Sequence, residues 1–163
     1  MKYLLILRHA KSSWKDADLP DHERPLNKRG KRDAPQVGVI MKQEDLMPDL
    51  ILCSTARRAR ETLKAVVEEA GYSGEIRYLP DLYHPDVSEI ISLLGTLDDQ
   101  VNTVMLVGHN PELEDLLQDI TELDLHLPTA ALALVKIGIQ SWKEAPAGLC
   151  GDMVRFWTPK DKA

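Results

Sequence analysis

The sequence Tyr3-Leu4-Leu5-Ile6-Leu7-Arg8-His9-Ala10 contains the pattern that decides the fold. Its first five residues form a short apolar run that ends at an arginine and a histidine. A run of this length, rich in leucine and isoleucine, is typical of a strand that is buried on both faces of a sheet. Residues 50–53 and 103–107 are short apolar runs of the same kind. We therefore expect three buried strands.

Segments of helical period separate these strands. Between residues 56 and 70 apolar side chains recur every three or four positions, and Gly71 then supplies a helix stop. Helices are also predicted at 28–42, with Pro35 in its first turn or at a kink, at 87–94, and after Pro111, with Asn110 as the N-cap. Further strands are predicted at 131–137 and near 153–157, before a polar tail from about residue 158. This alternation predicts an α/β fold with a mostly parallel central sheet, in a single domain spanning residues 1–163.

The composition excludes several classes of partner. The chain has 163 residues, with 26 acidic and 20 basic side chains and a net charge of −6. This balance gives no reason to expect nucleic acid or an anionic membrane surface as a partner. No apolar run approaches the roughly 20 residues of a transmembrane helix, and the first run is too short for a signal peptide. We expect a cytoplasmic monomer.

The residues that follow the predicted strands suit one kind of chemistry. Ligands of open α/β sheets bind beyond the carboxyl ends of the strands, where this chain has Arg8-His9, residues 54–58 and Gly108-His109. Arginines and histidines with few carboxylates favour a phosphoryl group over a metal ion. Arginines also crowd the start of the helix near residue 56, where a helix dipole disfavours cations unless an anion binds there. The pattern indicates a phosphate site.

Three segments then resemble the histidine phosphatase superfamily. Leu7-Arg8-His9-Ala10 is similar to its Arg-His-Gly hallmark, the segment from Ser54 to Thr62 is similar to its Ser-x-x-x-Arg-Ala-x-x-Thr helix start, and Gly108-His109-Asn110-Pro111 is similar to its second histidine segment. The segments that begin at Arg24-Pro25-Leu26 and at Leu127-Pro128-Thr129 resemble the compact branch typified by the phosphohistidine phosphatase SixA.

This resemblance implies a three-layer α/β/α sandwich like that of the phosphoglycerate mutases, and catalysis without a metal or another cofactor. It assigns His9 as a nucleophile that is transiently phosphorylated, and Arg8, Arg58 and His109 as the rest of the phosphate pocket. Two arginines and an imidazole can neutralise the equatorial oxygens of a transferring phosphoryl group. Neighbouring cations should also keep His9 neutral and nucleophilic. The implied substrates are phosphohistidine in a protein, or another phosphate with a good leaving group.

Several further positions carry weaker expectations. Asp81 is the best match to the general acid that larger members place after the third strand, and a solvated loop aspartate is the alternative. Ser12, Arg24 and His84 are candidates for substrate binding, His84 at the pocket mouth. Ala10 stands where glycine is common, and this change could narrow the approach of the backbone to phosphate.

Other functions compete with this interpretation. A small-molecule phosphomonoesterase or a mutase of the same superfamily would share the histidine chemistry, and a regulatory module could bind phosphate through the arginines without turnover. A cysteine-based phosphatase needs an arginine six positions after its cysteine, but Ala59 and Phe156 occupy those positions after Cys53 and Cys150. That class is excluded.

Overall fold

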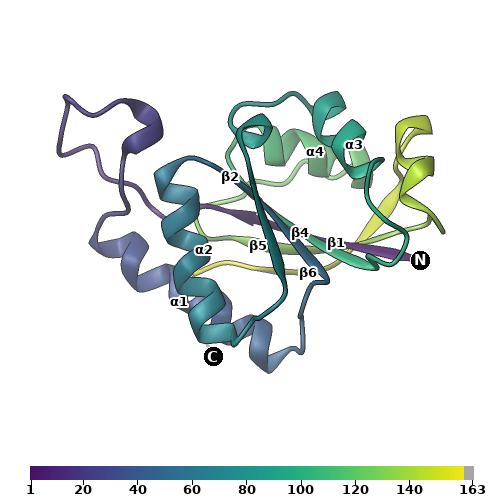
Figure 1. Ribbon diagram of the computed structural model, residues 1–163, viewed down its shortest axis with the longest axis horizontal. Coiled ribbons are helices and arrows are strands. Elements are labelled where there is room, and N and C mark those ends of the chain that lie inside the picture. The colour runs from purple at the N-terminus through teal and green to yellow at the C-terminus, as the bar shows by residue number, and fades with distance from the viewer. Residues whose placement is uncertain (160–163) are drawn as a thin grey trace.

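Six strands form one central sheet in the order β3-β2-β4-β1-β5-β6 (Figure 1). The computed structural model describes residues 1–159. The strands are β1 (Lys2–Arg8), β2 (Leu50–Ser54), β3 (Glu75–Leu79), β4 (Thr103–Gly108), β5 (Leu132–Ile137) and β6 (Gly151–Trp157). The pairs β1–β4, β2–β4 and β2–β3 are parallel, and β5 is antiparallel to both β1 and β6. The sheet is thus mostly parallel, as the sequence predicts.

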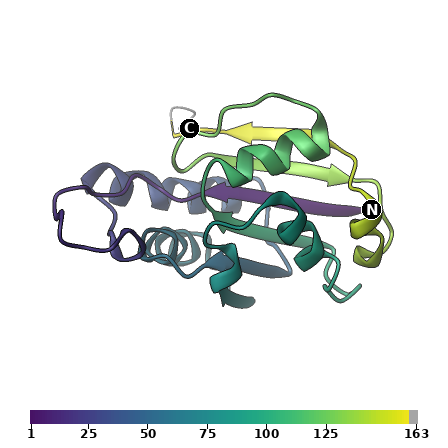
Figure 2. The ribbon, with the colours of Figure 1, turned by 90° about the horizontal axis from the view of Figure 1, so that it is seen from above.

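Helices cover both faces of this sheet and make the three layers visible in Figures 1 and 2. One face carries α1 (Lys28–Gln43) and α2 (Arg57–Ala70), and the other carries α3 (Val87–Leu94) and α4 (Glu112–Thr121). Successive residues of β1 point to opposite faces. Leu5 and Leu7 pack in the apolar cluster that includes residues of α1 and α2, and Leu4 and Ile6 pack in the cluster that includes residues of α3 and α4. The α/β/α sandwich is confirmed.

The structure also corrects the boundaries. Pro35 lies inside α1, beyond its first turn. Helix α4 begins at Glu112 with Pro111 as its N-cap, so the prediction that Asn110 caps this helix was wrong; the Asn110 side chain instead donates a hydrogen bond to the carbonyl of Leu127. Strand β3 was not predicted. The polar tail predicted from about residue 158 falls mostly on residues 160–163, which lie outside the described residues.

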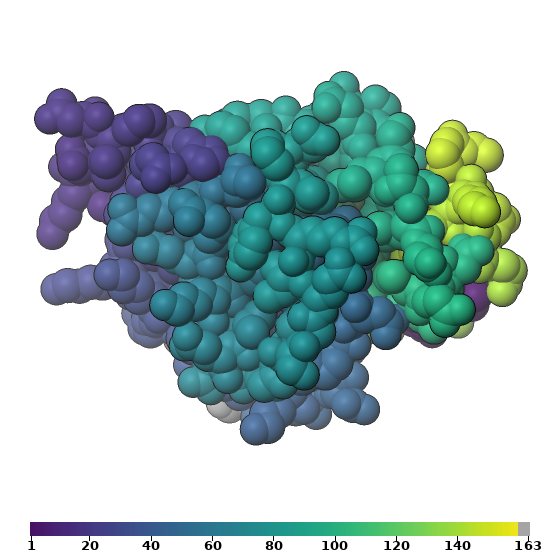
Figure 3. Space-filling view, in the orientation of Figure 1, coloured from purple at the N-terminus to yellow at the C-terminus, as the bar shows by residue number. Residues whose placement is uncertain are grey.

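The register of the parallel strands brings three chain segments to one edge of the sheet. Arg8 pairs with Gly108 across β1 and β4, and Cys53 pairs with Val107 across β2 and β4. Ser54, the last residue of β2, and His9 and His109, which follow β1 and β4, therefore lie at adjacent strand ends. The long connection from β1 to α1 projects from one end of the molecule beside this edge, as Figures 2 and 3 show in purple, and it contains the short 3-10 helix η1 (Asp21–Glu23). No helix formed by residues 1–159 is long and apolar enough to cross a membrane.

Candidate active site

His9 lies at the end of β1 with only 6% of its surface exposed. Its Nδ1 atom lies 2.7 Å from the carbonyl oxygen of Ala10. A carbonyl oxygen can only accept, so Nδ1 carries the proton and Nε2 keeps its lone pair. The backbone N–H of Ala10 donates to Thr62 Oγ1 at 2.9 Å, and Thr62 in turn donates to the carbonyl of Arg58, which fixes this turn against α2. Nε2 is therefore the ring nitrogen of His9 with a free lone pair.

His109 lies beside His9, with 5.1 Å between the ring centroids. Its Nε2 atom lies 2.8 Å from Oγ of Ser54, and that oxygen also accepts the N–H of Ala56 at 3.2 Å. Ser54 is fully buried, so its hydroxyl hydrogen needs an acceptor, and Nε2 of His109 supplies one. The remaining proton of the ring then lies on Nδ1. Ser54 therefore makes His109 a hydrogen-bond donor through Nδ1.

The two arginines reach the same site from different strand ends. Arg8 donates from Nη1 to the carbonyl of Leu127 at 2.9 Å. Arg58, which is 4% exposed on the first turn of α2, donates from Nη1 to the carbonyl of Asp21 at 2.7 Å and from Nη2 to Oδ2 of Asp21 at 3.0 Å. Each guanidinium group is thus oriented by a loop outside its own element.

Three donors of the site have no partner among the described residues. They are Nε of Arg8, Nε of Arg58 and Nδ1 of His109, and all three are buried. Leaving a buried donor without an acceptor costs about 1–3 kcal/mol, and more when the group is charged. Two cationic N–H groups and an imidazole N–H match the oxygens of a phosphoryl group. The chemistry of these donors suits an oxyanion.

The surroundings keep both imidazoles neutral. Burial lowers the pKa of His9 to about 3, and the positive charges of Arg58, Arg8 and Arg24 act in the same direction, against the Ala10 hydrogen bond. Burial also lowers the pKa of His109 to about 2, with a further contribution from His9. A neutral His9 at physiological pH has the lone pair that attack on phosphorus requires.

The weaker sequence predictions fall at different distances from this centre. Arg24 is buried, stacks over the ring of Trp14 and donates from Nε to Oδ1 of Asp21 at 3.2 Å. His84 is exposed, with its ring centroid 5.9 Å from that of His109. Ser12 is buried and pairs with Leu26 through an isolated β-bridge. The structure thus brings Arg24 and His84 to the site, and the role of Ser12 stays a prediction.

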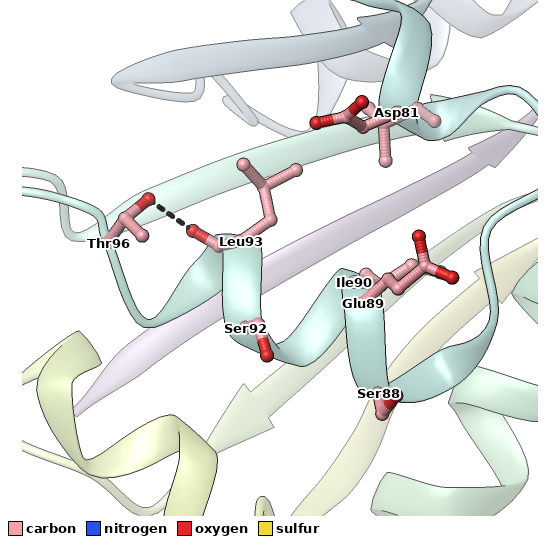
Figure 4. Close-up of a pocket in the computed structure, with 8 residues that line it drawn as sticks. Asp81, Ser88, Glu89, Ile90, Ser92, Leu93 and Thr96 are labelled. Carbon is pink, nitrogen blue, oxygen red and sulfur yellow. Dashed lines mark hydrogen bonds between the residues drawn. The ribbon is translucent and has the colours of Figure 1, made fainter.

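Asp81 lies in a different environment. It belongs to the 3-10 helix η2 (Pro80–Leu82) and lines a pocket with residues of α3 and the turn that follows it, as Figure 4 shows. None of Arg8, His9, Arg58 and His109 lines that pocket. The Asp81 side chain is exposed, and Figure 4 draws no hydrogen bond from it to the other residues that line the pocket. The structure therefore places Asp81 with α3 and gives it no contact with the phosphate site.

Sequence reasoning missed two residues that lie in the site. The hydroxyl of Tyr83 donates to Oδ2 of Asp21 at 2.5 Å, and the Tyr83 ring lies edge-on to His109 with 5.6 Å between centroids. Tyr83 adjoins His84 and could have been considered with it. Asp21 comes three residues before Arg24, in a loop of many charged residues where no spacing distinguishes it.

The described residues do not bring together the side chains that usually bind a metal ion. Across residues 1–159, no cluster of three or more histidine, cysteine, aspartate and glutamate side chains has a geometry that would hold one. The donors that converge at His9 are cationic or neutral nitrogens, which suit an anion better than a cation.

Comparison with known families decides the relationship. The model of the histidine phosphatase superfamily (branch 1) matches residues 4–92, which contain most of β1, all of α2 and both arginines of the site. The chain belongs to the histidine phosphatase superfamily. The resemblance seen in the three sequence motifs is thereby confirmed.

Relatives of this histidine phosphatase cover nearly the whole chain. An uncharacterised chloroplastic protein of Arabidopsis thaliana is 36% identical over 87% of this chain and 69% of its own length, and an uncharacterised protein of Mycobacterium tuberculosis is 32% identical over 94% of this chain and 100% of its own. The proposed phosphohistidine phosphatase SixA of Agrobacterium tumefaciens has a similar structure, with a TM-score of 0.84, 29% identity, and coverage of 97% of this chain and 98% of that one. The protein histidine phosphatase SixA in complex with tungstate shares the fold, with a TM-score of 0.84, 22% identity and 98% coverage of both chains.

Proposed function

We propose that this histidine phosphatase works without a metal ion, forms a phosphohistidine intermediate at His9, and acts on phosphohistidine in proteins or on another phosphate with a good leaving group. The observation that carries the proposal is the presence of buried, unpartnered donors on the three residues around His9: the His109 ring lies 5.1 Å from the His9 ring, and the charges of Arg8 and Arg58 act on His9. Those donors would bind the phosphoryl oxygens while Nε2 attacks the phosphorus in line.

The substrate class rests on two arguments. The similarity to the proposed phosphohistidine phosphatase SixA of Agrobacterium tumefaciens favours phosphohistidine. The second argument is chemical, because an imidazole leaving group needs less protonation than an alkoxide. In the site, Arg8, Arg58 and His109 would neutralise the charge of the phosphoryl group. This is sufficient for a leaving group that needs little protonation.

The test measures hydrolysis of a phosphohistidine peptide and of aryl phosphates, with EDTA present, by the wild-type protein and by His9→Ala. We expect turnover by the wild type and a loss of at least about 1,000-fold in His9→Ala. His126→Ala is the matched control, because His126 is exposed and has 76% of its side chain in solvent. It should keep wild-type rates.

Trapping the intermediate gives an independent readout. Rapid acid-free denaturation during turnover should leave a base-stable, acid-labile phosphoryl group on the wild type and none on His9→Ala. Hydrolysis that survives in His9→Ala would contradict the proposal. Binding of a phosphopeptide without hydrolysis by the wild type would favour the regulatory module instead.

A further inference from the structure

Asp21 is a carboxylate that lies beside Arg58 in the candidate site. Its Oδ2 atom accepts hydrogen bonds from Nη2 of Arg58 at 3.0 Å and from the hydroxyl of Tyr83 at 2.5 Å. Its Oδ1 atom accepts from Nε of Arg24 at 3.2 Å, and Nε2 of His84 lies 3.9 Å from Oδ2. The carboxylate is therefore held by groups from three separate segments of the chain.

The position of Asp21 relative to His9 is suited to one role. Arg58 contacts Asp21 directly and also contributes its positive charge to the environment of His9. His9 is 6% exposed and lies on the floor of the site, whereas the side chain of Asp21 is 42% exposed at the rim. In an in-line displacement, the leaving group departs on the side of the phosphorus opposite to the nucleophile. A phosphoryl group held by Arg58 over His9 would therefore have its leaving group on the solvent side, where Asp21 lies.

We propose that Asp21, and not Asp81, transfers the proton in the reaction of this site. The inference rests on the proposed function and extends it by naming the residue that lets the site accept poorer leaving groups. Asp81 has no comparable contacts, because it lines the pocket beside α3 (Figure 4).

Both steps balance with a single proton on Asp21. In the first step Nε2 of His9 bonds to phosphorus and the bond from phosphorus to the leaving oxygen breaks. That oxygen keeps the electron pair and takes the proton of the Asp21 carboxyl. In the second step a water oxygen bonds to phosphorus, the phosphorus–nitrogen bond breaks with its electron pair returning to Nε2, and the water proton passes to the Asp21 carboxylate. Orthophosphate leaves, and Asp21 is protonated again.

The surroundings of the carboxyl allow it to change its proton affinity during the cycle. The hydrogen bond from Tyr83 lowers the pKa of Asp21 to about 2, and the hydrogen bond and charge of Arg58 lower it as well. A bound phosphoryl dianion would take up donors of Arg58 and add negative charge nearby, and both changes raise the pKa of a carboxyl group. Proton uptake by Asp21 would thus be coupled to substrate binding.

The experiment compares Asp21→Asn with Asp81→Asn on phenyl phosphate and on para-nitrophenyl phosphate, whose leaving group is a more acidic phenol. We expect Asp21→Asn to lose about 100- to 1,000-fold in kcat/KM on phenyl phosphate and less than about 10-fold on para-nitrophenyl phosphate. Asp81→Asn should match the wild type on both substrates. Asp21→Glu restores a carboxyl and should recover part of the phenyl phosphate rate.

Two results would overturn the assignment. Equal losses on both substrates in Asp21→Asn would mean that Asp21 only positions Arg58. A selective loss on phenyl phosphate in Asp81→Asn would give the role to Asp81. If Asp21→Asn does not fold, the wild type alone decides: a rate that falls only slightly as the leaving phenol becomes more basic supports a proton donor, and a steep fall contradicts one. Failure of the proposed function has a separate signature, because His9→Ala would then keep its turnover.

Discussion

Oγ of Ser54 lies 2.8 Å from Nε2 of His109, and this contact determines which nitrogen of the His109 ring carries the proton. The serine hydroxyl donates to Nε2, so the ring proton lies on Nδ1, where no other described residue accepts it. Ser54 is the first residue of the Ser-x-x-x-Arg motif. The contact gives this serine a role at the end of β2, because its hydroxyl acts on the site through the protonation of His109.

Ser54→Ala should therefore slow the reaction without removing any charged group. A lost hydrogen bond of about 1–2 kcal/mol corresponds to a decrease of about 5- to 30-fold in kcat/KM on para-nitrophenyl phosphate. Ser92→Ala on α3 is the control, because Ser92 is exposed and far along the sequence from the motif. Equal rates in Ser54→Ala and the wild type would show that the ring is oriented by other contacts.

The planar geometry of the Arg58 guanidinium group should matter more for phosphate binding than its positive charge. Lysine keeps the charge but loses Nε and the planar pair of Nη groups that hold Asp21. We expect Arg58→Lys to bind orthophosphate or vanadate about 10- to 100-fold more weakly than the wild type, as measured by inhibition constants. Arg60→Lys changes an exposed arginine of the same helix turn and should leave the inhibition constants unchanged. Unchanged inhibition constants in Arg58→Lys would mean that only the positive charge at this position matters.

The sequence predicted the buried elements well, because a buried strand or helix face needs apolar residues and these are visible in the sequence. Strand β1 and strand β4 are continuous apolar runs with nearly every residue buried, and the predicted helix 87–94 matches α3 at both ends. Strand β3 was missed because it lies at the edge of the sheet, with three of its five residues exposed and a charged residue at its start. Its stability comes from pairing with β2, which no local pattern reveals.

The same reasoning explains which site residues were found. Arg8, His9 and His109 follow buried strands directly, so the topology of parallel sheets brings them together. Asp21 and Tyr83 come from two loops. Only the three-dimensional path of those loops places the Tyr83 hydroxyl oxygen 2.5 Å from Oδ2 of Asp21. Asp81 was predicted from its position in the motif, and its role as an acid remains a prediction; in the structure it lines the pocket beside α3, whereas Asp21 contacts Arg58.

The stability of the fold should depend on pH through the two active-site histidines. The pKa of His9 is lowered to about 3 and that of His109 to about 2, against about 6.5 in an unfolded chain. Below pH 6.5 the unfolded chain therefore binds protons that the folded chain does not, and the free energy of unfolding falls as the pH falls. The decrease approaches about 1.4 kcal/mol per pH unit for each histidine.

Urea unfolding at pH values from 7 to 5 checks this prediction. The range lies above the window in which Asp21 titrates, because the pKa of that carboxyl is lowered to about 2. Arg8, Arg58 and Arg24, which act on His9, keep their charge throughout this range, and His84 and Asp21 also act on His109. His109→Gln removes one of the two titrating groups and should reduce the slope of stability against pH by about half. A slope that is the same in His109→Gln and the wild type would contradict the role of burial.

Ala10→Gly separates the backbone of the nucleophile turn from its methyl group. Ala10 serves the site through its carbonyl, which orients His9, and through its N–H, which contacts Thr62. Its methyl group is fully buried in the cluster shared with α1 and α2. Loss of that methyl group and the greater freedom of glycine should together lower the free energy of unfolding by about 1–2 kcal/mol.

Turnover of para-nitrophenyl phosphate by Ala10→Gly should stay within about threefold of the wild type, because glycine keeps the carbonyl and the N–H through which Ala10 contacts His9 and Thr62. A threefold change corresponds to about 0.7 kcal/mol in activation free energy. Ala17→Gly, at an exposed loop position, is the control for stability. A change of more than tenfold in the turnover of Ala10→Gly would mean that the methyl group itself limits the approach of phosphate to the backbone, as the sequence comparison with glycine suggested.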